Sequence, residues 1–192
     1  MTSLNGKDTF LANHPLSAGV VGTYSRGSAN QIVKNADTVC FIGTKTGGMT
    51  THFWNIPEVG IPAIQIDIDP AEIGRNYPLK ASVQGDALTV LEKMLTLMDI
   101  STGKNRENWV KECNEIVSNW YSDFDTLLKS DDVPIRPERL CSELTNLVPS
   151  NSLIAVDTGH AGMWMGGMFD ITSPSQNYIR GNTFIFLDTI PI

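Results

Sequence analysis

Three glycines and a lysine lie close together at residues 43–48, which read Gly-Thr-Lys-Thr-Gly-Gly. Glycine allows the backbone to approach a ligand closely, and the N–H groups of such a turn can surround an anion. The spacing matches neither the P-loop nor the dinucleotide fingerprint. A phosphate or nucleotide cradle and a plain strand-to-loop turn therefore stay open as equal interpretations. Lys45 either balances an anion or points into water.

Two carboxylates follow a second apolar run. Asp67 and Asp69 could accept hydrogen bonds from the hydroxyls of a ribose. The sequence Asp69-Pro-Ala-Glu72 also suits the start of a helix, because an acidic N-cap is followed by proline in the first turn. We favour the helix start slightly. Residues 72–77 are expected to form a short helical turn.

A third polar cluster, Asp157-Thr-Gly-His160, follows an apolar run in the C-terminal part of the chain. The N–H group of Gly159 and the imidazole of His160 could contact a phosphate, and a solvent-facing turn is an equal alternative. No Gly-x-Ser-x-Gly elbow or Cys/His nucleophile pair is found, which argues against covalent hydrolysis. His14 and His52 have no further ligand at metal-binding spacing, so the sequence predicts no metal site.

Two strands must position the first two clusters. Residues 38–42 are uncharged and rich in β-branched and aromatic side chains, which predicts a strand buried on both faces of a parallel sheet. Residues 63–68 predict its neighbour, and a short strand is expected at 81–84. Ligands of an open α/β sheet bind beyond the carboxyl ends of the strands, so both clusters are expected on one rim.

Two helices are predicted around this sheet. Ser28 and Gln31 have the spacing of a capping box and open a helix that runs to Ala36. Asp86 is expected to cap the next helix. The apolar core face of that helix would consist of Val90, Leu91, Met94, Leu97 and Met98.

The C-terminal part of the chain predicts two more helices and one strand. Residues 106–128 carry one apolar stripe and form the longest predicted helix. Residues 137–147 predict another helix, with Pro137 in its first turn. A buried strand is expected at 152–156, and residues 157–162 are expected to form the turn at its carboxyl end.

Composition limits the class of protein. The chain has 192 residues, of which 41% are hydrophobic, so it can bury a core in one or two domains. Its 21 acidic and 14 basic residues give a formal charge of −7, which argues against nucleic acid or an anionic membrane as a bulk partner. No membrane span or signal peptide is found, so we expect a cytoplasmic protein. Cys40, Cys113 and Cys141 are widely spaced and are expected to serve packing, with Cys40 in a buried strand.

Four segments resemble, in order and spacing, the central domain of thiamine-diphosphate-dependent enzymes, with acetolactate synthase and its carboligase and oxidase relatives as the nearest kin. They are residues 13–26, 36–43, 66–75 (Ile-Asp-Ile-Asp-Pro-Ala-Glu-Ile-Gly-Arg) and 85–87. Residues 154–164 (Ile-Ala-Val-Asp-Thr-Gly-His-Ala-Gly-Met-Trp) similarly resemble the opening strand and first turn of that family's diphosphate-binding domain.

The resemblance implies an α/β fold. Residues 1–100 would form a partial Rossmann-like parallel sheet with flanking helices, as in the central domain of the family. Residues 101–134 would form a linker helix. Residues 135–192 would form the first αβ unit of a second α/β domain, which binds the diphosphate.

The resemblance also implies a function. The parent enzyme would be a carboligase or decarboxylase of 2-keto acids that uses thiamine diphosphate and Mg²⁺, forms a homodimer or higher assembly, and is compatible with FAD. A non-catalytic, FAD-type nucleotide-binding module is the main alternative, and a remnant that binds nothing is a third. The cofactor-binding residues that the resemblance implies are Gly43, Thr44, Lys45, Asp67, Asp69, Gly85, Asp86, Gly159, His160 and Ala161.

The sequence also departs from the family pattern. The catalytic glutamate of the family and its Gly-Asp-Gly to Asn magnesium motif have no match in this chain, and residues 182–187 (Asn-Thr-Phe-Ile-Phe-Leu) replace a Gly/Ala-rich segment. We therefore expect an inactive fragment with no catalytic or metal-binding residue of its own. The helix at 109–127 and the glycine-rich segment 159–167 are expected to be left with exposed apolar surface.

Overall fold

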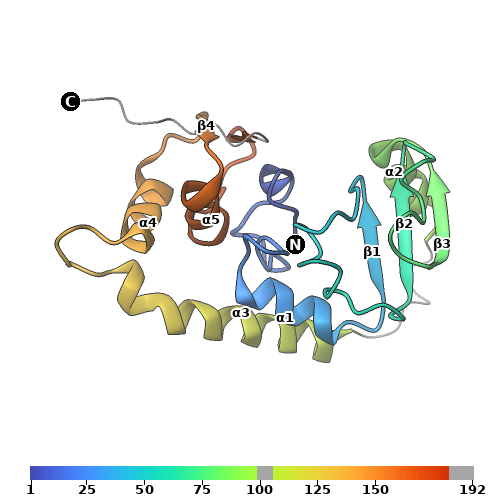
Figure 1. Ribbon diagram of the computed structural model, residues 1–192, viewed down its shortest axis with the longest axis horizontal. Coiled ribbons are helices and arrows are strands. Elements are labelled where there is room, and N and C mark those ends of the chain that lie inside the picture. Colours follow the sequence, from blue (N-terminus) through green and yellow to red (C-terminus); the bar gives the residue numbers. More distant parts are fainter. Residues whose placement is uncertain (99–105, 182–192) are drawn as a thin grey trace.

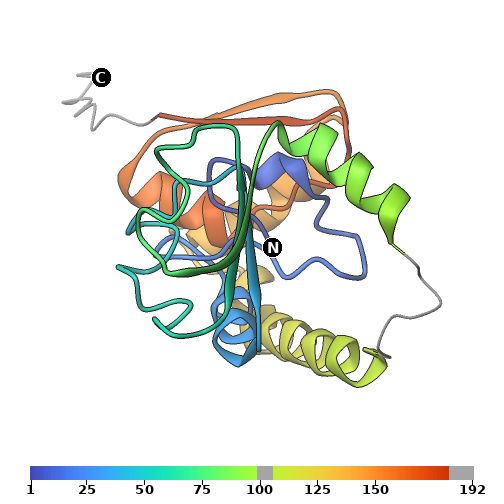
Figure 2. The same ribbon diagram turned by 90° about the vertical axis from the view of Figure 1, so that its right-hand side faces the viewer.

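A computed structural model describes residues 1–98 and 106–181 of the chain (Figure 1). A three-stranded sheet lies at one end of the molecule, and a helical unit with a two-stranded sheet lies at the other. The N-terminal segment lies between these ends, and one long helix runs along the side of the molecule. Figure 2 gives the end-on view from the three-stranded sheet. The fold is α/β, as the sequence predicts.

The three-stranded sheet consists of β1 (Val39–Ile42), β2 (Ala63–Asp67) and β3 (Leu79–Gln84). Its strands are all parallel and lie in the order β1-β2-β3. Val39 pairs with Ala63, so the two strands run in step to their carboxyl ends. The turns that follow the three strands therefore share one rim, as predicted.

Three helices accompany this sheet in the sequence. Helix α1 (Gly27–Asn35) precedes β1, and α2 (Ala87–Leu97) follows β3. Helix α3 (Glu107–Leu128) packs along α1, where Trp109 and other side chains of its predicted apolar stripe cover Ile32. The predicted bounds of the longest helix are confirmed to within one residue.

The other end of the molecule is a second, smaller αβ unit. Helix α4 (Pro137–Leu147) is followed by β4 (Leu153–Val156), α5 (Gly159–Met168) and β5 (Asn177–Arg180). Strands β4 and β5 pair in parallel. The bounds of α4 agree with the prediction, whereas β5 was not predicted.

The N-terminal segment packs against this second unit. Leu4 and Val20 pack in one core cluster with Phe169. Lys7, in the short 3₁₀ helix η1 (Lys7–Thr9), donates from Nζ to the carbonyl of Gly166 at 2.8 Å. These contacts link residues that are far apart in the sequence, so the start of the chain is part of the core of its C-terminal unit.

A charged cluster also links the N-terminal segment to the second unit. Arg26 Nε donates to the carbonyl of Gly167 at 2.7 Å, and its Nη2 forms an ion pair with Asp170. The hydroxyl of Tyr121, on α3, donates to the second carboxylate oxygen of Asp170 at 2.9 Å. The Arg26 guanidinium also lies 4.7 Å from the centroid of the Trp120 ring. Helix α3 is thereby tied to both the N-terminal segment and the second unit.

Several predictions of burial are wrong. Strand β1 is not buried on both faces, because only Phe41 is buried and Cys40 is exposed. Strand β4 is mostly exposed as well, with only Val156 buried. The predicted core face of α2 is mostly exposed, since Val90 is half-buried, its other four residues are exposed and no residue of that helix is buried. In each case an apolar run forms the expected element, but the described residues cover only part of its surface.

Some local predictions are also wrong. Ser28 does not cap α1, because it lies inside the helix and its hydroxyl donates to the carbonyl of Ala18 at 3.3 Å. The helical turn predicted at residues 72–77 is absent, because residues 70–74 form a non-helical turn and residues 75–77 form a bend. Residues 159–168 form α5 where a turn was expected. The apolar run after Arg180 lies outside the described residues.

The described helices also bear on membrane insertion. None of those in residues 1–98 and 106–181 is long and apolar enough to cross a bilayer.

Candidate functional site

The glycine turn (residues 43–48) leaves β1 at the rim of the three-stranded sheet. Gly43 has a φ of +58°, in the left-handed region that glycine adopts without strain. Its N–H group donates to the carbonyl of Ile66 on β2 at 2.9 Å, so the turn begins as a continuation of the sheet. No described atom lies within 4 Å of a Cβ placed at Gly43 or Gly47. Open space therefore lies beside the backbone of the turn.

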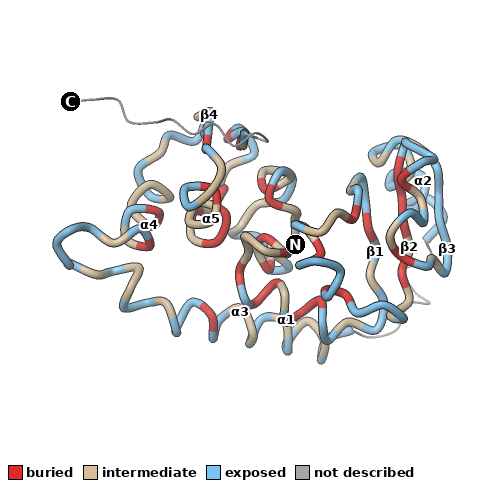
Figure 3. Tube along the Cα trace, viewed as in Figure 1, coloured by how far each residue is buried: buried red, intermediate tan, exposed pale blue. Residues whose placement is uncertain are grey.

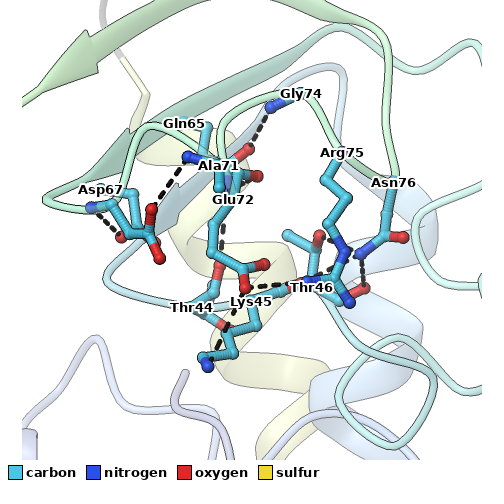
Figure 4. A network of polar contacts seen from close by, with 11 residues as sticks. Thr44, Lys45, Thr46, Gln65, Asp67, Ala71, Glu72, Gly74, Arg75 and Asn76 are labelled. Atoms are coloured by element: carbon cyan, nitrogen blue, oxygen red, sulfur yellow. Dashed lines mark hydrogen bonds and ion pairs between the residues drawn. The ribbon is translucent and has the colours of Figure 1, made fainter.

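Side chains from β2 and the following loop hold this turn in place (Figure 4). Gln65 Nε2 donates to the carbonyls of Thr44 and Glu72, at 3.4 and 3.1 Å. Asn76 Nδ2 donates to the carbonyl of Lys45 at 3.0 Å. These hydrogen bonds engage carbonyl oxygens of the turn, so they fix its backbone without consuming the amide donors that an anion would need.

Glu72 contributes a buried carboxylate to the same network. It is 5% exposed, and its Oε1 forms a 2.8 Å ion pair with Arg75. Lys45 Nζ lies 3.9 Å from the same oxygen, but the Lys45 side chain is 80% exposed. Water screens such a long and exposed pair, so the contact is weak. Lys45 therefore keeps its charge available to a ligand at the rim.

The acidic residues after β2 close a tight turn. Asp67 Oδ1 accepts a hydrogen bond from the N–H of Asp69 at 3.0 Å, and Asp69 Oδ1 accepts one from the N–H of Ala71 at 2.9 Å. The N–H of Gly85 donates to the carbonyl of Asp67 at 3.0 Å, which places these residues on the same rim. One oxygen of each carboxylate therefore holds the local turn.

Asp86 caps α2, as predicted. Its Oδ1 accepts hydrogen bonds from the N–H and the hydroxyl of Thr89, both at 3.0 Å. The bond from the backbone N–H of Thr89 is the main cause that lowers the pKa of Asp86 from its ordinary value. This carboxylate is therefore engaged in the start of the helix.

A cavity of about 510 Å³ lies beside the glycine turn. Its lining includes Gly43, Thr44 and Lys45 from the turn, Tyr24 from the N-terminal segment and Arg180 from β5. The structure thus brings three of the predicted residues to one cavity. The other predicted residues of this rim are not among its described lining residues: Asp67, Asp69, Gly85 and Asp86.

The later predicted cluster forms the first turn of α5. Gly159 begins the helix with a φ of +64°, and no described atom lies within 4 Å of a Cβ placed there. His160 and Ala161 are exposed in the same turn. Just before the helix, Asp157 Oδ1 accepts a hydrogen bond from the N–H of Thr158 at 2.7 Å. The N–H groups of a first helical turn have no partner within the helix and attract anions, so these residues lie where an anion can bind.

Arg180, at the end of β5, was not selected from the sequence. Its guanidinium carbon lies 5.2 Å from the centroid of the Tyr24 ring, and its Nε is buried without a hydrogen-bond partner among the described residues. A Cβ placed at Gly162 of α5 would lie 3.0 Å from that Nε. The side chain therefore lies where α5, the N-terminal segment and the cavity meet. A basic residue at the end of a short apolar run was the available signal.

The described residues offer no evident metal centre. Within residues 1–98 and 106–181, no group of three or more His, Cys, Asp or Glu side chains could hold a metal ion.

Comparison with known proteins identifies the family of this fold. The sequence profile of the thiamine pyrophosphate enzyme central domain matches residues 1–94. A "Probable acetolactate synthase large subunit" of Methanococcus aeolicus is 32% identical over 186 residues, which cover 90% of this chain and 31% of the relative. Its counterpart in Methanocaldococcus jannaschii is 33% identical over 190 residues, covering 94% and 31%. The acetolactate synthase large subunit of Cyanidium caldarium is 25% identical over 163 residues, covering 85% and 28%.

The parallel sheet, with its turns gathered at the carboxyl edge, defines an α/β protein. The matches make this class specific: the chain belongs to the family of thiamine-pyrophosphate-dependent enzymes similar to acetolactate synthase. It spans less than a third of the length of these relatives, at 31%, 31% and 28%.

Proposed function

We propose that the chain is the cofactor-binding part of a thiamine-diphosphate-dependent enzyme that makes or breaks a carbon–carbon bond of a 2-keto acid. The family and the arrangement of β4 and α5 support this proposal. The observation that carries it is the open first turn of α5, where Gly159, His160 and Ala161 lie at the carboxyl end of a parallel strand.

The first turn of α5 would hold the diphosphate of the cofactor. Its N–H groups and the positive end of the helix dipole favour an anion, and the imidazole of His160 adds a hydrogen-bond donor. A Cβ at Gly159 would fill open space in front of the helix, so glycine keeps room for phosphate oxygens. When bound, thiamine diphosphate supplies the electron sink for bond chemistry beside the keto group.

Magnesium and a partner subunit belong to the same proposal. Mg²⁺ prefers octahedral oxygen ligation and binds through phosphates, so it would share the diphosphate with α5. The resemblance assigns the activating glutamate and the magnesium motif to segments that find no match here. We therefore expect the 192-residue chain by itself to bind thiamine diphosphate weakly and to turn over no 2-keto acid. The parent assembly would be a cytoplasmic homodimer or a larger oligomer.

We propose three consecutive parts of the chain with different roles. Residues 1–100 would act as the central domain, residues 101–134 as a linking helix, and residues 135–192 as the opening of the diphosphate-binding domain. The position of α3 supports the middle assignment, because this helix packs on α1 and leads directly into α4.

A nucleotide-binding module is the second candidate function. The cavity beside the glycine turn favours it, because its volume of about 510 Å³ is within the range of small-molecule sites. A nucleotide such as FAD would place phosphates near Gly43, Thr44 and Lys45. The rim residues Asp67, Asp69, Gly85 and Asp86 would then lie toward the adenosine part.

A calorimetric titration with thiamine diphosphate and Mg²⁺ tests the first candidate. We expect weak binding that Gly159→Ala abolishes, because the added Cβ both strains a left-handed position and fills the anion space. Gly60→Ala is the matched control, since Gly60 also has a positive φ, +112°, and open space around its Cβ position. Equal affinities in the two variants would remove α5 from the proposal. Turnover of pyruvate by the chain alone would contradict the expected inactivity.

A further inference from the structure

Helix α2 presents apolar side chains that the described part of the chain leaves uncovered. Leu88, Leu91, Leu95 and Met98 are 66%, 37%, 71% and 59% exposed. The helix contains no buried residue and lies at the periphery of the molecule (Figure 2). Single exposed apolar residues are common on protein surfaces, whereas several gathered on one element mark an interaction surface. Helix α2 is therefore a candidate contact for another chain.

These four residues form one stripe along the helix, which we call the α2 stripe. They follow one another at intervals of three, four and three residues. Residues three and four apart lie on the same face of an α-helix. Met98 is the C-cap of α2, so the stripe extends over nearly its whole length. Alternating intervals of three and four are typical of a helix that packs against a second helix.

The α2 stripe also has the same spacing when it is read in either direction from Lys93. An antiparallel second copy of α2, related by a two-fold axis at Lys93, would place Leu88 opposite the partner's Met98. The same axis would place Leu91 opposite the partner's Leu95. One symmetry operation thus pairs all four apolar side chains of each copy, as an isologous interface requires. A second copy of the chain is therefore the partner that this spacing fits.

The charges of α2 are compatible with such a pair. Residues 87–98 include only two charged side chains, Glu92 and Lys93, although the chain as a whole has a formal charge of −7. With 3.6 residues per turn, Lys93 lies on the face opposite the stripe, so the two lysines do not meet. Glu92 lies beside the stripe, and the axis brings the two copies of this carboxylate near each other. Their repulsion is an electrostatic cost that salt would screen.

An apolar cavity of about 690 Å³ adjoins the stripe. Leu91 belongs to both, since it lines the cavity together with Ala87, Phe10 and residues 39–42 of β1. None of the described lining residues has a charged side chain. The two-fold axis places the partner's Leu95 opposite Leu91, so this leucine would cover the α2 side of the cavity. The same contact would then bury apolar surface on both α2 and β1.

We propose that α2 is a self-association surface, through which two copies of the chain pair by their α2 stripes in antiparallel orientation. The exposed parts of the eight side chains amount to an area on the order of 500 Å². Stable complexes bury at least roughly 1,200 Å², so this dimer is weak, with a Kd on the order of 0.1 mM. The chain is then a monomer at a few micromolar. The inference does not depend on the proposed cofactor sites.

Sedimentation equilibrium of the full chain, from about 5 to about 500 μM, tests the proposal. The average mass should rise from that of one chain, 21.0 kDa, toward twice that value. Leu95→Lys should remain monomeric throughout, and its fold should persist because this side chain is exposed. Leu147→Lys is the matched control, since Leu147 on α4 is 74% exposed and lies outside the stripe. A monomer at all concentrations, or equal loss of association in both variants, would overturn the proposal.

Cysteine cross-linking tests the antiparallel orientation. Leu88→Cys and Met98→Cys are made separately in a chain in which Cys40 and Cys113 are replaced by serine. A mixture of the two variants should form a disulfide-linked pair under copper-catalysed oxidation by air. Each variant alone should not, because its two cysteines lie at opposite ends of the paired helices. Cross-linking of Leu88→Cys with itself that equals the cross-linking in the mixture would contradict the geometry.

The two charged residues of α2 give a further test that leaves the apolar contact intact. Glu92→Gln should lower the Kd of the dimer by about two- to fivefold, because it removes a repulsion between exposed carboxylates. Lys93→Gln, on the opposite face, should leave the Kd unchanged. Raising the NaCl concentration should also strengthen association of the unchanged chain and have little effect on Glu92→Gln. Equal effects of the two substitutions would show that a different face of α2 is in contact.

Discussion

The two ends of the molecule differ in how far their apolar side chains are buried (Figure 3). In the second unit, Phe169 and Ile171 are 0% and 1% exposed, because the N-terminal segment, α4 and β4 close around them. At the three-stranded sheet, helix α2 buries no residue, and Leu95 and Leu97 are 71% and 73% exposed. The same kind of amphipathic sequence is thus core at one end and surface at the other.

This difference shows that an apolar stripe predicts a helix with one apolar face, but does not predict which element of the chain covers that face. The apolar stripe of α3 packs against α1, and Trp120 on the same helix is only 7% exposed. The expectation that residues 109–127 and 159–167 would be left with exposed apolar surface is therefore wrong for Trp120 and for Gly166 and Gly167, which are buried. Exposed apolar side chains lie on α2, and some also lie in the second unit, where Leu147, Leu153 and Ile179 are exposed. We expect the second unit to carry most of the stability.

The largest expected effect is a truncation in the second unit. Phe169→Ala should lower the free energy of unfolding by about 3–5 kcal/mol, because it leaves a cavity in a fully enclosed site. Leu95→Ala, on exposed α2, should change it by less than about 0.5 kcal/mol. Urea unfolding followed by circular dichroism measures both. Similar losses in the two variants would mean that α2 is covered and that the contrast between the two ends is wrong.

The next effect is a pH dependence of stability that arises from Lys7, which is buried where the N-terminal segment packs against the second unit. Burial, the largest cause, lowers the pKa of Lys7 to about 7, far below its ordinary value. Between about pH 7 and the ordinary lysine pKa, the unfolded chain binds a proton that the folded chain does not. Stability should therefore rise with pH through this window, by up to about 1.4 kcal/mol per unit from Lys7 alone.

Three other buried groups limit this rise at higher pH. Burial raises the pKa of Cys141 to about 11 and those of Tyr121 and Tyr178 to about 12. Their protonated forms are favoured in the folded chain, so Cys141 offsets the Lys7 effect above about pH 9, and the two tyrosines make stability fall above about pH 10. Unfolding free energies at pH 7, 8 and 9 should increase for the unchanged chain and stay nearly flat for Lys7→Met. An equal slope in both would exclude Lys7 as its source.

The smallest expected effect is local and lies at the other end. Asp86→Ala removes the cap of α2, so hydrogen exchange of the α2 amides should accelerate by about threefold to tenfold. The amides of α5 should not change, because α2 shares no core with them. Lys93→Ala on the same helix is the control. Faster exchange in both helices would show that the two ends unfold as one unit.

Local sequence determines the elements that were predicted well. Helix α4 starts at Pro137, where proline fits the first turn, and Asp86 caps α2 through its own oxygen. These features depend on residues within one or two helical turns. The parallel sheet and its shared rim follow from two apolar runs that each end in a turn, so most of the fold class could be predicted.

Tertiary contacts determine the features that were missed. Four glycines between residues 159 and 167 predict a turn, since each costs a helix about 1 kcal/mol relative to alanine. Helix α5 forms nevertheless, because a Cβ at Gly166 would lie 2.8 Å from Leu4, so glycine permits the close approach of the N-terminal segment. Arg180 was missed for the same reason, as its position at the cavity depends on Tyr24, which is far away in the sequence.

Proton NMR of the histidine imidazoles tests the central claim, that the first turn of α5 binds the diphosphate of thiamine diphosphate. The chain has three histidines, so His14 and His52 serve as internal controls for His160. Addition of thiamine diphosphate with Mg²⁺ should shift the His160 signals and leave the other two in place, and thiamine without phosphates should shift none. An unchanged His160 signal at saturating thiamine diphosphate, or equal shifts with thiamine alone, would contradict the assignment of α5 as the diphosphate site.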